Sequence, residues 1–71
     1  MDLMTIIALV AKGLGVVTAL AEAGKNVVPA VTAIKNLVNS TKDGTVTDAE
    51  VDATDAQLDA MLTKFDLPLV R

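Results

Sequence analysis

The fold is decided by residues 3–21, LMTIIALVAKGLGVVTALA, in which Lys12 is the only charged side chain. The apolar residues recur at spacings of three and four, which predicts an α-helix with two adjacent apolar stripes. The first stripe comprises Leu3, Ile7, Val10, Leu14, Val17 and Ala21, and the second comprises Ile6, Leu9, Gly13, Val16, Leu20 and Ala23. A helix that is apolar over most of its circumference is normally enclosed by other helices or by lipid.

Two glycines, Gly13 and Gly15, interrupt this helix. Each lowers helix propensity by about 1 kcal/mol relative to alanine, a cost tolerated where another backbone must approach closely. Gly13 belongs to the second stripe, so we expect a close helix contact there.

A second helix is predicted after Gly24, which favours a helix end, and Pro29 fits the first turn of the new helix. Its apolar face runs from Val31 to Val38, and we expect it to end near Asn39. The N-terminal half is therefore either two helices in a bent pair or one kinked helix.

A third, acidic amphipathic helix is predicted within residues 47–66. Thr47 and Glu50 form a capping box, in which the Thr47 hydroxyl accepts from the Glu50 amide and the Glu50 carboxylate reaches back to the Thr47 amide. The helix has three faces: a large apolar face of Val51, Leu58, Met61, Leu62 and Phe65, a small-residue seam of Ala49, Ala53, Ala56 and Ala60, and an acidic face of Asp48, Asp52, Asp55 and Asp59. Pro68 opposes helix at Leu67, so residues 67–71 are expected to form an extended tail.

These signals predict an all-α protein with helices at about 3–23, 28–39 and 48–65. We expect one small domain over residues 1–71, divided into an apolar helical region (1–39), a loop (40–46), the acidic helix (47–66) and the tail (67–71). Ordering each residue costs about 1.5 kcal/mol, which in a chain this short roughly cancels the gain from burial. We therefore expect oligomerisation to complete the fold.

The composition argues against an enzyme. The chain has no His, Cys, Trp or Tyr, and Phe65 is its one aromatic residue. The usual transition-metal ligands, the commonest general base and the cysteine nucleophile are therefore missing. We predict no catalytic residue, no metal ligand and no cofactor.

The charge distribution argues against nucleic acid as a partner. The net charge of −3 divides into +2 over residues 1–42 and −5 over residues 43–71, and no Lys/Arg cluster offers a phosphate track. No basic region precedes the apolar stretch and no clear cleavage site follows it, so we expect it to belong to the mature protein rather than to a signal peptide.

The acidic face is the one group of side chains that suggests chemistry. Like charges at three- and four-residue spacing repel by a few tenths of a kcal/mol. We favour a solvated face, with acids stabilised near the helix N-terminus. The alternatives are pairing with a basic surface of a neighbour and, least favoured, catalysis by two of the aspartates.

Residues 39–50, NSTKDGTVTDAE, resemble the calcium loop of an EF-hand. Asp43, Gly44 and Glu50 match its fifth, sixth and twelfth positions, as Val46 does its eighth. The first and third ligand positions hold Asn39 and Thr41 instead of acids, and Lys42 adds positive charge. We therefore favour a turn leading into the capping box, with weak or absent calcium binding.

The apolar N-terminal helix, the turn GTVTDAE (44–50) and the ending LDAMLTKFDLPL (58–69) resemble small all-helical proteins of tailed bacteriophages. The resemblance implies a phage context, as a minor virion component or a member of a lysis cassette. It carries no active residue.

Two functions follow as expectations. In the first, the chain is a noncatalytic assembly subunit of the virion, present in the host cytoplasm before assembly, that packs against its own copies or a larger virion protein. Its predicted interaction face comprises Leu3, Ile7, Val10, Gly13, Leu14, Val17 and Leu20.

In the second, residues 3–21 span the host inner membrane, as in a holin-like pore former, with small residues such as Gly15 and Ala19 at helix contacts. Lys12 at the centre of that segment would cost about 2.5–3.5 kcal/mol on insertion, which favours assembly over membrane.

Overall fold

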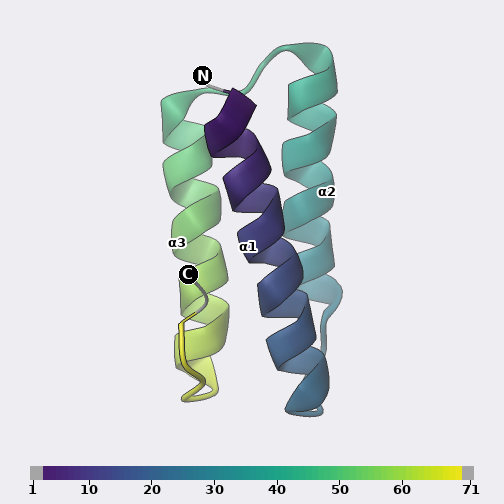
Figure 1. Cartoon of the computed structure of the whole chain (residues 1–71), viewed down its shortest axis with the longest axis vertical. Helices are drawn as coiled ribbons and strands as arrows, with labels where there is room; N and C mark the ends of the chain where they lie inside the picture. Colours follow the sequence, from purple (N-terminus) through teal and green to yellow (C-terminus); the bar gives the residue numbers. More distant parts are fainter. Residues whose placement is uncertain (1–2, 70–71) are drawn as a thin grey trace.

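The computed structural model describes residues 3–69 and folds them into three helices: α1 (Leu3–Glu22), α2 (Val28–Asp43) and α3 (Asp48–Lys64). The helices pack against one another in an elongated bundle with extents of 34 × 17 × 16 Å. α1 and α3 run in the same direction and α2 runs antiparallel to both (Figure 1). The prediction of an all-α fold is confirmed, and the N-terminal half is two helices rather than one kinked helix.

The turn between α1 and α2 follows the sequence signals closely. Gly24 adopts a left-handed conformation (φ 71°), and the Lys25 amide donates to the Leu20 carbonyl at 2.8 Å. This arrangement satisfies carbonyls that the end of α1 leaves free. The Asn26 side chain then accepts from the Val28 amide at 3.0 Å, and Pro29 lies in the first turn of α2.

The second helix is longer than predicted. α2 continues to Asp43, so residues 40–43 of the predicted loop are helical and the link to α3 is only 44–47. Gly44, with φ 70°, ends the helix, and the Thr45 amide donates to the Ser40 carbonyl at 2.9 Å. The prediction failed because Asn39 and Ser40 have low helix propensity, whereas Ser40 gains a partner on α3: its hydroxyl donates to Glu50 Oε1 at 2.7 Å.

The start of α3 confirms half of the predicted capping box. Thr47 is the N-cap, and its hydroxyl oxygen accepts from the Glu50 amide at 3.1 Å. The Glu50 carboxylate, however, accepts the hydroxyl of Ser40 and thereby joins α2 to α3, whereas no hydrogen bond within residues 3–69 links it to the Thr47 amide.

The far end of α3 closes one end of the bundle. After Lys64 the chain turns through Asp66 (φ 60°), and the Leu67 amide donates to the Leu62 carbonyl at 3.0 Å. Leu67 and Phe65 pack against the core, and Lys25 Nζ lies 5.0 Å from the centre of the Phe65 ring. Of the predicted tail, residues 67–69 are non-helical and residues 70–71 lie outside the described part.

The core lies between the three helices and belongs to a single chain. It contains the second stripe of α1, the inner residues of α2 and the large apolar face of α3: Ile6, Leu9, Val16, Leu20, Ala30, Ala33, Leu37, Val51, Leu58 and Leu62. Met61 and Phe65 are partly buried against it. The predicted alanine seam of α3 contributes nothing to this core, because all four of its alanines are exposed.

Candidate functional site

The predicted interaction face is divided by the bundle. Gly13 and Leu20 are buried between the helices, so they are not available to another protein while the bundle is intact. Three members remain open to solvent: Leu3 is 62% exposed, Ile7 is 52% exposed and Leu14 is 57% exposed. The other two members, Val10 and Val17, are partly buried beside the core. The available surface is thus the first stripe of α1.

Gly13 shows why the second stripe is the inner one. A Cβ atom at this position would lie 2.5 Å from Ile34 Cγ1 and 2.8 Å from Ile34 Cδ1, so only glycine lets α2 come this close. The close approach expected at Gly13 is therefore with α2 of the same chain.

A second row of apolar side chains on α2 extends the open stripe of α1. Val31 is 45% exposed and Val38 is 40% exposed, while Ile34 between them is partly buried. Val38 borders the same groove as Leu3, Ile7 and Val10, a groove of about 310 Å³ between the two helices. We call this combined surface the hairpin face; it comprises Leu3, Ile7, Val10, Leu14 and Val17 of α1 with Val31, Ile34 and Val38 of α2.

The α2 part of the hairpin face was not predicted as a binding surface. Its signal was present in the sequence, because Val31, Ile34 and Val38 follow the same three- and four-residue spacing as the stripe of α1. What the sequence could not show was that the packing of α2 beside α1 brings Val38 to the same groove as Leu3, Ile7 and Val10.

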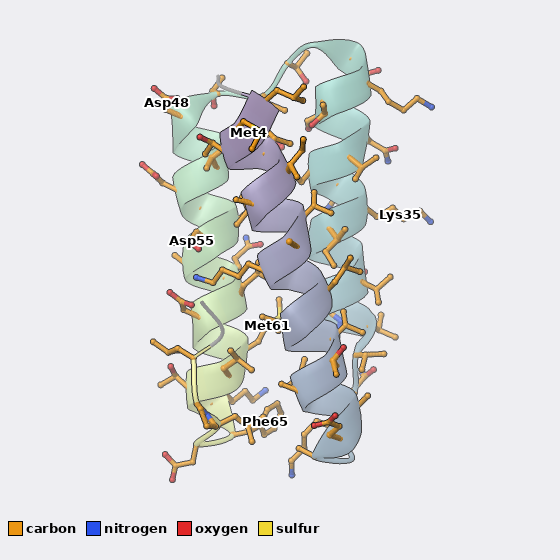
Figure 2. All side chains as sticks on the ribbon, in the orientation of Figure 1. Met4, Lys35, Asp48, Asp55, Met61 and Phe65 are labelled. Atoms are coloured by element: carbon orange, nitrogen blue, oxygen red, sulfur yellow. The ribbon has the colours of Figure 1, made fainter. Side chains whose placement is uncertain are left out.

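The acidic face of α3 separates into two pairs. Asp55 and Asp59 point toward Lys12 of α1, whose Nζ lies 2.5 Å from Asp55 Oδ1 and 2.8 Å from Asp59 Oδ1. The other two acids, Asp48 and Asp52, are exposed. Figure 2 shows Asp48 at the outer edge of α3, on the opposite side of the bundle from Lys35 on α2. The favoured interpretation of a fully solvated face therefore fails for two of the four acids, whose cation comes from the same chain.

The electrostatics of this cluster favour a charged Lys12. The lysine side chain is 19% exposed, and its pKa is raised above 10.5, first by the hydrogen bond to Asp55 and then by that to Asp59. Burial of the ammonium opposes this shift but is the weaker effect. The cluster thus joins α1 to α3 and pairs the one charge within the apolar stretch 3–21.

A shallow cavity of about 340 Å³ lies beside this cluster, between α1 and α3. It is lined by Thr5, Ala8, Leu9, Lys12, Val51, Asp52 and Asp55. Of its charged lining residues, Asp55 is paired with Lys12 and Asp52 is exposed. Within the described residues 3–69, no group of three or more His, Cys, Asp or Glu side chains is placed to hold a metal ion.

In the segment 39–50, which resembles an EF-hand loop, the residues at the calcium-ligand positions lie on two different helices. Asn39, Thr41 and Asp43 lie on the last turns of α2, and the Thr41 hydroxyl donates to the Leu37 carbonyl at 2.8 Å. Glu50 lies on the first turn of α3 and accepts from Ser40.

One described helix is long and apolar enough to cross a bilayer, by length and composition alone. It is α1, Leu3–Glu22, and 28% of its apolar segment is buried within the bundle. A core helix of a water-soluble bundle also meets these criteria.

No protein-family model, no curated protein and no solved structure matches this chain.

Proposed function

We propose that the chain is a noncatalytic helical assembly subunit that binds another protein through the hairpin face. The observation that carries this proposal is the exposure of Leu3, Ile7 and Leu14 on a helix whose opposite stripe already forms a packed core. Isolated exposed apolar residues are normal on a protein surface, whereas a contiguous apolar row on two adjacent helices is typical of a binding surface. The context we propose is a phage virion, by resemblance of the sequence to small phage proteins.

The rest of the molecule supports a binding role rather than catalysis. The charged cluster of Lys12, Asp55 and Asp59 joins two helices of the same chain, and its lysine is paired with both carboxylates. The groove of the hairpin face is lined mainly by aliphatic side chains, which suit the packing of a helix.

The test is the behaviour of the purified full chain in buffer without detergent. We expect a soluble protein whose mass by light scattering rises above that of one chain as the concentration is increased. A stable, cooperatively unfolding monomer at all concentrations would contradict the proposal.

A second candidate, a holin-like membrane protein, is favoured by one observation: α1 has the length and composition of a membrane span. Insertion would require α1 to leave its buried contacts and would separate Lys12 from the carboxylates of Asp55 and Asp59. A bundle that already satisfies this lysine therefore favours assembly.

A further inference from the structure

The hairpin face has the spacing of a coiled-coil seam on both of its helices. On α1 the open stripe advances by four, three, four, three and four residues from Leu3 to Ala21. On α2 the row from Val31 through Ile34 and Val38 to Thr41 advances by three, four and three residues. Such a 3–4 repeat positions side chains as knobs for the holes of a facing helix. An antiparallel helix pair with this pattern on one side is half of a four-helix bundle.

We infer that the hairpin face binds the same face of a second copy of this chain, so that α1 and α2 of two copies form an antiparallel four-helix bundle with each α3 on the outside. This inference rests on the proposed function, because it names the partner for the same surface. The interface is isologous: each copy offers one face and receives the identical face.

The side-chain sizes along α1 favour the antiparallel orientation. The sequence of spacings along its open stripe is the same from either end. In an antiparallel pair, each stripe residue of one copy therefore faces a stripe residue of the other copy such that the two residue numbers add up to 24. The facing pairs are Leu3 with Ala21, Ile7 with Val17, and Val10 with Leu14. Each pair joins a larger with a smaller side chain, which lets the layers interdigitate. A parallel copy would instead place Leu3 opposite Leu3 and Ala21 opposite Ala21.

The available area matches what a dimer needs. A standard interface buries about 800 Å² on each partner. That is about a sixth of the total accessible surface of 4513 Å², and one long side of a 34 × 17 × 16 Å rod makes up about a fifth of the surface of that rod.

The charges at the border of the hairpin face distinguish two possible partners, a second copy of this chain and an acidic protein. No acid belongs to the hairpin face, and Lys42 lines its groove while Lys35 lies on the exposed side of α2. A second copy presents the same acid-free apolar face to these lysines, so the affinity should depend little on added salt. An acidic partner would bind more weakly as salt increases.

The first experiment measures self-association of the full chain by analytical ultracentrifugation at 50 and 500 mM NaCl. Leu14→Ser should raise the dimer dissociation constant at least tenfold without loss of helix content by circular dichroism, because Leu14 is 57% exposed in the single chain. The matched control is Val28→Ser, since Val28 is 61% exposed but lies outside the face; we expect less than a twofold change.

The second experiment determines the relative orientation of the two copies from disulfide formation. Single cysteines can be introduced for this purpose because the chain has none of its own. Val10→Cys and Leu14→Cys variants are mixed and oxidised. The antiparallel dimer predicts that the mixed 10–14 disulfide forms in excess over either homodimeric disulfide. Dominant 10–10 and 14–14 disulfides would overturn the antiparallel arrangement.

The outcomes also separate this inference from the proposed function. Dimers that are weakened by Leu14→Ser but form the 10–10 and 14–14 disulfides would overturn the antiparallel bundle while leaving the hairpin face as a binding surface. Oligomers whose affinity is unchanged by Leu14→Ser would overturn both, because the proposed function also assigns binding to this face. A stable monomer at every concentration would overturn both.

Discussion

Gly13 on α1 and the side chain of Ile34 on α2 are in close contact, since a Cβ atom on Gly13 would lie 2.5 Å from Ile34 Cγ1. Gly13→Leu should therefore lower the free energy of unfolding by about 2 kcal/mol, the typical cost of inserting a side chain into a packed contact. Thr5→Leu is the matched control, because Thr5 is exposed on the same helix. Urea unfolding followed by circular dichroism measures both variants; equal stability would show that Ile34 moves aside without cost.

The same contact explains what the sequence could and could not predict. Helix ends at Gly24 and Thr47 were predictable, because a left-handed glycine and an N-cap act locally. The choice of inner stripe on α1 was not, since both stripes have similar residues and spacing. It is decided by how close α2 comes at Gly13 and by where α3 brings the partners of Lys12.

The missed parts of the site are likewise long-range. Lys12 and Asp55 are 43 positions apart, so nothing in the local pattern could pair them. Residues 40–43 had the composition of a loop, but the contact of Ser40 with Glu50 fixes them in α2. Both depend on the topology of the bundle rather than on local propensity.

Calcium should have little effect on this protein. The ligand positions suggested by the EF-hand resemblance are divided between α2 and α3, and the Glu50 carboxylate accepts the Ser40 hydroxyl. A site with so few acids binds calcium weakly. Titration calorimetry up to millimolar calcium should show no saturable heat, with magnesium as the matched control. A site of micromolar affinity would contradict this prediction.

Alkaline pH should remove the stabilisation contributed by Lys12. Its pKa in the folded protein is raised above 10.5, chiefly by Asp55, so folding favours the charged ammonium. That contribution is present in full below the unfolded pKa and is lost as the pH rises through the folded pKa. Lys12→Met should lower the free energy of unfolding by about 1 kcal/mol at pH 8. The gap between wild type and variant should close above pH 10.5.

Thermal unfolding across pH 7–11.5 measures this gap, with Lys35→Met as the control on the outer side of α2 (Figure 2). A gap that persists unchanged at the highest pH would show that the aliphatic part of Lys12, rather than its charge, stabilises the bundle.

Lys12 also separates assembly from membrane insertion. In the bundle, its ammonium is held by Asp55 and Asp59, and α1 can enter a bilayer only by leaving them. Lys12→Leu removes this attachment and also the cost of about 2.5–3.5 kcal/mol of a charge at the centre of a membrane helix. We expect wild-type protein in the soluble fraction of expressing bacteria and part of the Lys12→Leu protein in membranes after a carbonate wash, which removes peripheral proteins. The control is Lys35→Leu, which introduces the same leucine side chain on α2; we expect this variant to remain in the soluble fraction. Wild-type protein retained in washed membranes, together with loss of membrane potential on expression, would refute the assembly function and favour the holin-like one. Such a result would mean that the pairing of Lys12 with Asp55 and Asp59 does not keep α1 out of the bilayer.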